Sequence, residues 1–440
     1  MPDRKIRLGV LAVFLLAIII GVWLYLSGGR ARLPVEAVTG PTPQITAPRP
    51  RIIPAFNFVK AVGWPEGAKP TPAAGLNVKA FADKLDHPRW MLVLSNGDVL
   101  VAETAAPPSE GGGIRDWIMG LAMDRVGADA SSANRITLLR DVNGDGVADR
   151  RSVLLKGLNS PFGMALIGDH LYVGNTDALV RFPFKVGQTR IDTPAEKILS
   201  LPGGGHWTRN VVANADGSKL YVGIGSNSNV AENGMEAEAN RATIIEVDTK
   251  TRDYRIYAGG LRNPVGMAWE PTTDALWTVV NERDGLGGDL VPDYLTAVQF
   301  GGFYGWPWYY WGGYTDSRAP EPERDMRQYT ARPDYALGPH VAALGLTFAE
   351  DAALGPRFTD GAFVGLHGSW NRKPLSGYKV IYVPFENGRP AGKPVDVLTG
   401  FLNDDQEALG RPVGVTIDGK GALLVADDVG NRIWRVTAGK

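Results

Sequence analysis

The stretch "NPVGMAWEPTTDALWTVV" (Asn263–Val280) combines Pro-x-Gly, an apolar run, a polar turn and a second apolar run. The same order recurs in "SPFGMALIGDHLYVGNT" (Ser160–Thr176) and in "RPVGVTIDGKGALLVADD" (Arg411–Asp428). Short apolar runs joined by tight polar turns are typical of β-hairpins. The glycine lets the backbone approach a crowded axis where a side chain would not fit. The pattern therefore predicts a repeated β-sheet unit.

Six such units can be aligned, two of them degenerate. Their first positions are Pro88, Pro161, Thr208, Pro264, Ala343 and Pro412. Radial stacking of short sheets is the architecture of a β-propeller. We expect an all-β, six-bladed β-propeller over residues 75–440, whose last strands close on "LNVKAFADKL" near residue 80. A pair of β-sandwiches is the alternative, and it explains the repeats less well.

The composition limits the classes of partner and chemistry. The 440 residues include 46 basic and 47 acidic side chains, for a net charge of −1, with no basic stripe. This balance argues against nucleic acid as a partner. The chain has no cysteine, which excludes disulfides, thiolate nucleophiles and cysteine-ligated metals. The 55 glycines and 31 prolines favour many turns and short strands over long helices.

The amino-terminal segment predicts a membrane anchor. Residues 8–26 are uncharged, and their length nearly matches a hydrocarbon core of roughly 30 Å. Arg4, Lys5 and Arg7 favour a cytoplasmic position for residues 1–7. We expect an uncleaved inner-membrane anchor that leaves the body in the periplasm. A cleaved signal, with release into the periplasm, is the alternative.

Residues 27–74 are rich in proline, alanine and glycine and predict a semi-extended linker. Three aromatic residues in it favour packing of part of this linker on the body: Phe56, Phe58 and Trp64. A second aromatic stretch, "YGWPWYYWGGY" (Tyr304–Tyr314), predicts either a sugar-stacking wall or the core of an insertion.

His206 is the histidine best placed for catalysis. It follows three glycines in "PGGGHWTRN" and precedes the inner strand of the third unit. Glycines there allow a ligand to approach the backbone. A neutral imidazole at that position can accept a proton from a substrate hydroxyl. The alternative is a histidine bonded to a neighbouring loop. His340 and His367 bracket the fifth unit, where they either flank the same cavity or serve a structural role.

Arginines occupy corresponding entry positions in several units: Arg209, Arg262 (followed by Asn263) and Arg411. Guanidinium groups that face one axis repel each other unless an anion lies between them. Such a set predicts a planar ligand with several negative charges. The alternative is that each arginine pairs with a local carboxylate, which we favour for Arg209. Two more cations lie on the loop of the fifth unit: Arg372 and Lys373.

Two acidic, glycine-containing loops predict calcium sites. The first is "NERDGLGGDLVPDYL" (Asn281–Leu295), with Glu282, Asp284, Gly285 and Asp289 as its candidate ligands. A solvated surface turn is the alternative there. The second is "DVNGDGVADRRS" (Asp141–Ser152), which follows the order of an EF-hand loop except for Ser152 at the twelfth position. Its candidate ligands are Asp141, Asn143, Asp145 and Asp149. We expect it to be structural or weak and to lie away from the inner ends of the units.

Together these segments resemble the glucose/sorbosone dehydrogenase family, six-bladed propellers that use pyrroloquinoline quinone (PQQ). The resemblance rests on "GHWTRNVVANADGSKLYVGIG", "GLRNPVGMAWEP", "NERDGLGGD" followed by "GGFYGWP", "HGSWNRKPLSGYKV" and "GRPVGVTIDGKGALLVADD". It covers roughly residues 75–440. The "HGSWNR" stretch points to the sorbosone-dehydrogenase-like branch. One departure is Val265, which stands where the glucose enzymes have a polar residue.

The resemblance implies that a sugar or sugar aldehyde is oxidised by hydride transfer to PQQ. His206 matches the catalytic base, Arg262 and Asn263 match residues that hold the quinone, and Arg411 matches a cofactor-binding arginine. Arg262 would also stabilise the developing oxyanion. The turn 284–289 matches a calcium-binding turn, where the ion acts as a Lewis acid. Arg372 or Lys373 would supply a cation over the cofactor carboxylates.

Other functions remain open from the residues alone. Electrons would leave the reduced cofactor to a cytochrome or to a membrane quinone. One alternative function is a calcium-dependent lactonase or esterase on a β-propeller, which would use converging carboxylates and no inward arginines. Another is a non-enzymatic periplasmic propeller, which the departure at Val265 favours.

Overall fold

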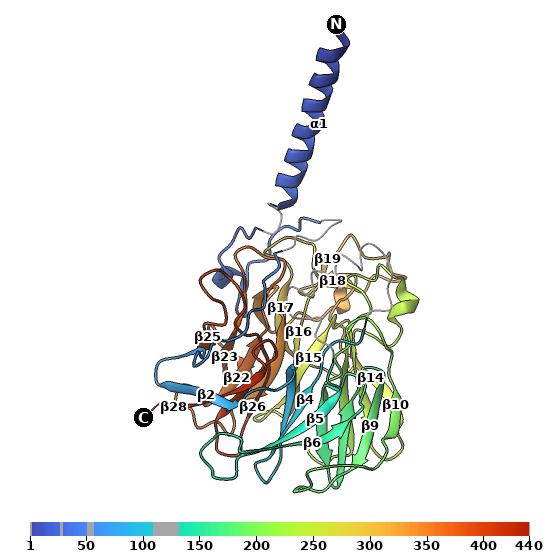
Figure 1. Ribbon diagram of the computed structural model, residues 1–440. Helices are drawn as coiled ribbons and strands as arrows, with labels where there is room; N and C mark the ends of the chain where they lie inside the picture. The colour runs from blue at the N-terminus through green and yellow to red at the C-terminus, as the bar shows by residue number, and fades with distance from the viewer. Residues whose placement is uncertain (1, 27–29, 51–56, 109–131, 440) are drawn as a thin grey trace.

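The computed structural model describes residues 2–26, 30–50, 57–108 and 132–439. The body consists of six antiparallel sheets that follow one another along the chain (Figure 1). Each sheet contains one of the six repeat units, and we number the sheets as blades 1 to 6. This arrangement confirms the predicted all-β, six-bladed β-propeller.

The first three blades each have four strands, which are named from the innermost outward. Blade 1 contains β3 (Pro88–Val93), β4 (Val99–Glu103), β5 (Arg135–Arg140) and β6 (Arg150–Lys156). Blade 2 contains β7 (Met164–Ile167), β8 (His170–Gly174), β9 (Ala178–Pro183) and β10 (Glu196–Ser200). Blade 3 contains β11 (Val211–Ala213), β12 (Lys219–Ile224), β13 (Thr243–Asp248) and β14 (Tyr254–Gly259).

Among the last three blades, blade 4 carries an insertion, and blades 5 and 6 each include a strand from the amino-terminal side of the chain. Blade 4 contains β15 (Pro264–Glu270), β16 (Ala275–Val280), β17 (Pro292–Ala297) and β20 (Tyr335–Pro339). Blade 5 contains β21 (Ala343–Phe348), β22 (Gly361–Leu366), β23 (Lys379–Glu386) and β25 (Val395–Thr399), with β1 (Thr71–Pro72) and β24 (Arg389–Pro390) at its edge. Blade 6 contains β26 (Pro412–Ile417), β27 (Leu423–Asp427), β28 (Arg432–Ala438) and β2 (Leu76–Ala82).

The ring is closed by a strand from the amino-terminal side of the propeller. Strand β2 pairs antiparallel with β28, and Leu76 lies opposite Ala438. The predicted closure near residue 80 is therefore confirmed. Pairing the two ends of the propeller in one sheet holds the ring shut.

The repeated glycine is needed because the innermost strands contact each other in a closed ring around the axis. A Cβ added to Gly345 would lie 2.1 Å from the carbonyl oxygen of Val413, in the next blade. A Cβ on Gly163 would lie 2.2 Å from the amide nitrogen of Val211. Both distances are too short for any side chain. Two further glycines of the repeat are equally confined: Gly266 and Gly414.

The residue before each of these glycines fills the axis. Phe162, Val265 and Val413 are fully buried and belong to one apolar cluster with Trp90 and Leu344. These five residues come from five different blades. Val265, which departs from the resemblance, is therefore a packing residue of the axis.

One face of the propeller collects the loops of interest. In an antiparallel blade whose first strand is innermost, the segment entering the first strand and the segment joining the second to the third strand lie at the same end. The loops 201–210, 260–263, 281–291, 367–378 and 400–411 all belong to these two classes. The candidate residues of the predicted site therefore share one face. The loop 141–149 joins β5 to β6 and lies at the opposite end.

The segment before the propeller packs on blades 4 to 6. Its regular elements are the 3-10 helix η2 (Val35–Val38) and the short strand β1. Phe58 stacks on Trp370 with ring centroids 6.2 Å apart, and Trp64 packs edge-on against Phe401 and Trp434. The expected packing of these aromatic residues is confirmed, whereas Phe56 lies outside the described residues.

The amino-terminal helix α1 (Pro2–Leu26) stands away from the blades (Figure 1). Within the part of the chain that the structure describes, no helix is both long and apolar enough to cross a membrane. The anchor expected over residues 8–26 thus stays a prediction.

The aromatic stretch after β17 forms the core of an insertion in blade 4. Its hairpin consists of β18 (Tyr309–Tyr310) and β19 (Tyr314–Thr315). Five of its aromatic side chains are buried: Tyr304, Trp306, Tyr309, Tyr310 and Trp311. Two short 3-10 helices complete the connections: η3 (Met235–Glu238) and η4 (Arg327–Tyr329).

Replacing Gly345 by alanine is expected to destabilise the whole propeller. The added methyl group would overlap Val413 in the next blade, and such overpacking costs about 2 kcal/mol of unfolding free energy. The midpoint of urea-induced unfolding measures this change. Gly419→Ala is the matched control, because a Cβ at Gly419 meets nothing within 4 Å. Equal midpoints for the two variants would contradict the steric role of the repeat.

Candidate functional site at the axial rim

Charged and polar side chains from five blades form a connected ring above the apolar axis. We call this ring the axial rim and define it by Arg89, His206, Arg262, Asn263, Asp284, His367, Arg411 and Asp428. Six of the candidate residues from the sequence lie in it: His206, Arg262, Asn263, Asp284, His367 and Arg411. The contacts below connect its members, although they are far apart in the chain.

His206 has one ring nitrogen fixed and the other available. Its Nδ1 lies 2.9 Å from the carbonyl oxygen of Ser226, which can only accept a hydrogen bond. The proton therefore resides on Nδ1, and Nε2 carries a lone pair. Burial, together with the positive charge of Arg262, lowers the pKa of His206 to about 3. The imidazole is neutral near pH 7, as a proton acceptor must be.

Gly225 brings His206 and Asn263 together. A Cβ at Gly225 would lie 2.3 Å from Asn263 Oδ1 and 2.5 Å from His206 Cβ. Asn263 Oδ1 is buried and has no hydrogen-bond donor among the described residues. This unpaired acceptor, close to the backbone of His206, is a group that a ligand can complete.

Arg262 lies between His206 and the acidic turn of blade 4. Its guanidinium donates to the carbonyl oxygen of Glu282 at 2.9 Å and to Asn229 Oδ1 at 3.0 Å. Its nearest carboxylate is that of Asp284, with Nη2 and Oδ2 3.9 Å apart. Arg262 is thus held mainly by neutral oxygens, so its positive charge is only partly compensated.

Asp428 anchors one arginine and two histidines on the other side of the axis. Its Oδ2 lies 2.6 Å from Arg89 Nη1, 2.9 Å from His367 Nε2 and 3.4 Å from His87 Nε2. Burial, aided by the charge of Arg411, lowers the pKa of His367 to about 4. Burial would raise the pKa of Asp428, but its interactions with His367, His87 and Arg89 hold that pKa well below its usual value.

Arg411 is buried and poorly paired. Its Nη2 donates to the hydroxyl of Tyr378 at 2.9 Å, and its guanidinium carbon lies 5.2 Å from the centroid of that ring. Its backbone amide donates to Asp427 Oδ1. The Nε atoms of Arg411 and Arg89 are both buried without an acceptor in the described part of the chain.

Two contacts join the two halves of the rim. The guanidinium carbon of Arg89 lies 5.6 Å from the ring centroid of Trp207, and Trp207 directly follows His206 in the chain. Asn371, from the same loop as His367, donates to Asp284 Oδ1 at 2.7 Å. The rim is therefore one constellation around the axis.

Most oxygens of the predicted calcium turn accept hydrogen bonds from protein donors, although Glu282 Oε1 is buried without a partner among the described residues. His340 places Nδ1 3.1 Å from Asp284 Oδ1 and Nε2 3.0 Å from the carbonyl oxygen of Gly287. Burial alone would lower the pKa of His340, but its bonds to Asp284 and Gly287 raise it. Arg372 Nε donates to the carbonyl oxygen of Gly288 at 2.8 Å.

The remaining acidic residues of this turn also have other partners. Asp289 accepts the backbone amides of Arg32 and Leu33, and Glu282 Oε2 accepts from Arg283 at 2.9 Å. Gly285 supplies the turn with a positive φ of 86°. In residues 30–50, 57–108 and 132–439, no three acidic or histidine side chains form a group that could hold a metal. As arranged, these residues do not fit a calcium ion.

The second acidic loop is closed by a lysine. Lys420 Nζ lies 3.2 Å from Asp141 Oδ2 and 2.9 Å from the carbonyl oxygen of Gly144. The side chains of Asn143, Asp145 and Asp149 bond to backbone amides or to each other within the loop. This loop lies on the face opposite the rim, where the sequence placed it.

Three predicted cationic residues lie outside the rim contacts. Arg209 is fully buried and donates to three carbonyl oxygens, those of Pro202, His206 and Thr208, instead of a carboxylate. Arg372 braces the turn at Gly288, and Lys373 is exposed. Arg209 thus shapes the loop that presents His206.

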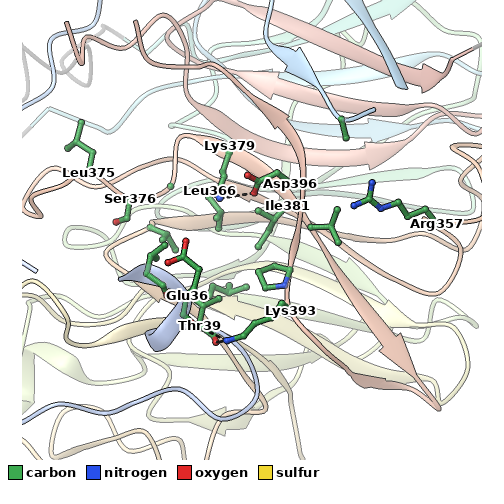
Figure 2. Close-up of a pocket in the computed structure, with 17 residues that line it drawn as sticks. Glu36, Thr39, Arg357, Leu366, Leu375, Ser376, Lys379, Ile381, Lys393 and Asp396 are labelled. Atoms are coloured by element: carbon green, nitrogen blue, oxygen red, sulfur yellow. Dashed lines mark hydrogen bonds and ion pairs between the residues drawn. The ribbon is translucent and has the colours of Figure 1, made fainter. Parts of the chain in front are cut away.

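A cleft of about 630 Å³ lies elsewhere, between η2 and the outer strands of blade 5 (Figure 2). Its wall includes Glu36, Leu366, Ile381 and Lys393. None of the residues predicted for the site lines this cleft.

Comparison with known proteins places the chain in a family. A family model described as TrAA12-like matches residues 70–292 and 318–439. The chain belongs to the TrAA12-like family. This assignment supports the general family indicated by the motifs and does not distinguish the sorbosone branch.

Relatives of this TrAA12-like protein include two curated sequences. An aldose sugar dehydrogenase of Escherichia coli is 25% identical over 312 residues, which cover 66% of this chain and 78% of the relative. An uncharacterized protein of Borreliella burgdorferi is 30% identical over 239 residues, 52% of this chain, and the match spans 60% of that relative's length.

The same architecture occurs in a solved structure. The holo PQQ domain of a pyranose dehydrogenase from Coprinopsis cinerea matches with a TM-score of 0.66 at 20% identity. The match covers 86% of this chain and 100% of that chain. At this identity the likeness shows the fold.

Sequence reasoning missed two rim residues of the TrAA12-like protein. Arg89 follows Pro88 at the entry of the first unit, close to the entry positions that Arg262 and Arg411 occupy in their units, and this position was the available signal. Asp428 follows the second strand of blade 6, as Asp284 follows that of blade 4. Aligning the unit ends as well as the unit starts would have identified it.

The protonation state of His206 gives a test of the rim geometry. At pH 5.5, we expect ¹⁵N NMR of labelled protein to show His206 neutral with its proton on Nδ1, and His367 neutral as well. The folded pKa of His206 lies below its ordinary value of 6.5, so the unfolded chain binds more protons between about pH 3 and 6.5. This residue therefore makes stability rise with pH in that window.

His206→Gln identifies the His206 signal and removes its contribution to the pH dependence of stability. An imidazolium at position 206 at pH 5.5 would contradict the described environment.

Proposed function

We propose that this protein oxidises a sugar or a sugar aldehyde at the axial rim with PQQ as its cofactor. The names of relatives support this chemistry, since they include an aldose sugar dehydrogenase and the PQQ domain of a pyranose dehydrogenase. Sorbosone-type substrates are the finer expectation, which rests on the "HGSWNR" stretch.

The excess of buried guanidinium groups carries the proposal. Arg89, Arg262 and Arg411 are largely buried around the axis, while Asp284 and Asp428 are the rim carboxylates. Two of the arginines also have a buried Nε without an acceptor. A buried, unpaired polar group costs about 1–3 kcal/mol. A planar anion with several acceptor oxygens would remove this cost at several positions.

PQQ has the chemistry that these donors require. It is a planar tricarboxylate, and planar guanidinium groups bind carboxylates through paired hydrogen bonds. We assign Arg89, Arg262 and Arg411 to its carboxylate and carbonyl oxygens, with Asn263 beside them. When bound, PQQ supplies the two-electron acceptor that oxidation of an alcohol or a hydrated aldehyde requires.

The protein's own residues supply proton transfer and orientation. His206 Nε2 accepts the proton of the substrate hydroxyl. The carbonyl of Ser226 keeps the other nitrogen protonated and fixes the plane of the ring. Arg262 disfavours the charged imidazole before the reaction and offers its guanidinium to the substrate oxygen as that oxygen loses its proton.

The calcium ion of the resemblance stays a separate proposal. Because the oxygens of the turn 284–289 accept bonds from His340, Arg372 and the backbone, we derive no step through the ion. Calcium binding measured by calorimetry, and lost in Asp284→Asn, would support a metal at this turn.

The cellular setting also belongs to the proposal. An anchor over residues 8–26 would hold the propeller at the periplasmic side of the inner membrane, where a cytochrome or a membrane quinone would accept the electrons. Protease protection of the full chain in spheroplasts measures this orientation, and a protected propeller would contradict it.

Separate variants are expected to separate binding from catalysis. Arg411→Met should weaken PQQ binding at least tenfold, or about 1.4 kcal/mol, because a buried charged partner is lost. His206→Ala should keep that affinity within a few-fold and lower kcat by about 100-fold or more. Absorbance titration with PQQ and dye reduction with aldoses measure the two quantities. Arg255→Met is the control, because Arg255 pairs with Glu246 on the outer edge of blade 3.

The competing functions give different results in the same assays. A protein that binds no PQQ but hydrolyses lactones when calcium is added would be a lactonase. If the protein neither binds PQQ nor turns over a sugar or a lactone, the remaining interpretation is a non-enzymatic propeller.

A further inference from the structure

The segment that precedes the propeller contacts the rim loops directly. We call residues 30–50 and 57–64 the strap. The range matched by the family model begins at residue 70, so the strap lies outside it. Its contacts nevertheless fall on three loops that carry residues of the axial rim.

The first contact is on the acidic turn of blade 4. Asp289 is 3% exposed, and its Oδ2 accepts the backbone amide of Arg32 at 2.8 Å while Oδ1 accepts that of Leu33 at 3.4 Å. The backbone amide of Arg49 donates to the carbonyl oxygen of Leu286 at 2.9 Å. A buried carboxylate requires such donors. The strap thus holds both the middle and the end of the turn that begins at Asp284.

The second contact is on the loop of blade 5 that carries Asn371. Asn57 donates through its amide side chain to the carbonyl oxygen of Arg372, and through its backbone to that of Trp370, both at 2.7 Å. The Arg372 guanidinium joins this loop to Gly288 and, at 3.5 Å, to the carbonyl oxygen of Leu33. Strap, turn and loop therefore form one bonded unit.

The third contact is beside Arg411. Trp64 Nε1 donates to Asp427 Oδ2 at 2.6 Å, and Asp427 Oδ1 accepts the backbone amide of Arg411 at 2.8 Å. Trp434 Nε1 donates to the same Oδ2 at 3.0 Å. Asp427 is fully buried, so its orientation depends on these donors. Through this carboxylate, Trp64 fixes the entry of blade 6 at the rim.

We propose that the strap is a positioning element of the site, which holds the turn 284–289, the loop 369–374 and Arg411 in the arrangement that binds the cofactor. This inference rests on the proposed function. Its residues act through the loops and touch no reacting atom.

The energetics favour this role. The turn contains Gly285 and Gly287 with positive φ, and glycine has more alternative conformations to lose than any other residue. If the loops spend only a fraction of the time in the binding arrangement, the apparent affinity falls by that fraction. A drop of the competent fraction to one tenth would weaken binding about tenfold. Turnover at saturating cofactor would stay unchanged.

The test uses the full chain with two strap variants, Trp64→Phe and Asn57→Ala, and with one variant of the residue that the strap contacts, Asp289→Ala. We expect each to raise the Kd for PQQ by about 3- to 30-fold, while kcat at saturating PQQ stays within twofold of the unmodified protein. Asp289→Asn should restore part of the affinity, because its amide oxygen still accepts one strap amide.

A second measurement needs no cofactor. Without PQQ, hydrogen–deuterium exchange should become faster in peptides containing Asp284 and Ser369, whose amides donate to Asn229 Oδ1 and to the carbonyl of Ser376. The matched control is Lys393→Met. Lys393 Nζ bonds to the strap carbonyls of Glu36 and Thr39, both at 2.7 Å, on the outer side of blade 5 (Figure 2). This variant should change neither the exchange of those two peptides nor the affinity.

The outcomes separate the strap from the proposed function. If hydrogen–deuterium exchange and the Kd for PQQ are both unchanged in Trp64→Phe and Asn57→Ala, the proposed positioning role of the strap is wrong. An effect confined to Asp289→Ala would also overturn it, since Asp289 would then act on the ligand itself. If the unmodified protein binds no PQQ, the proposed function fails, and the exchange of the two peptides still decides whether the strap holds the loops.

Discussion

The close approach of the innermost strands at the axis is the constraint on which the rest of this propeller depends. Where Gly345 meets Val413 there is no space for a β-carbon, so each unit must begin with a backbone that lies flat against its neighbour. The residue before each glycine then points to the axis and fills it with apolar atoms. Because the axis is filled, the polar residues that precede each unit are gathered into one ring at its end. The recurrence of Pro-x-Gly thus determines both the architecture and the place of the site.

The same crowding produces the electrostatics of the rim. Removing several guanidinium groups from water around one axis is costly unless each finds acceptors. Arg209 donates through its two terminal nitrogens to carbonyl oxygens and becomes structural, whereas Arg89 and Arg411 belong to the rim. The Nε atoms of all three arginines are buried without an acceptor among the described residues. His206 is held neutral by burial and by Arg262. The rim thus combines a neutral imidazole, which can accept a proton, with guanidinium groups that outnumber the nearby carboxylates. This combination suits a substrate that loses a proton next to a negatively charged cofactor.

Most of the fold could be predicted from the sequence, and only part of the site. The six units and the closing strand were predictable because each is marked locally, by Pro-x-Gly or by alternating apolar residues. His206, Arg262 and Arg411 were predictable because they occupy equivalent positions in those units. The partners of Asp289 were not, since they are backbone amides of Arg32 and Leu33, more than 250 positions away in the chain. Backbone donors carry no residue signature, so spacing alone could not reveal them.

Both acidic loops show what residue spacing can and cannot specify. Carboxylates separated by glycines create a concentrated negative potential, and the sequence located two such loops correctly. The potential does not determine which cation compensates it. At Asp141 the compensating group is the ammonium of Lys420, and at Asp284 it is the imidazole of His340, whose two nitrogens bridge a carboxylate and a carbonyl. A side chain tethered by its own backbone competes for these oxygens at a high effective concentration. A divalent ion at either loop would therefore compete with a protein group for the same oxygens, whereas the buried Nε atoms of Arg89 and Arg411 have no acceptor among the described residues to give up.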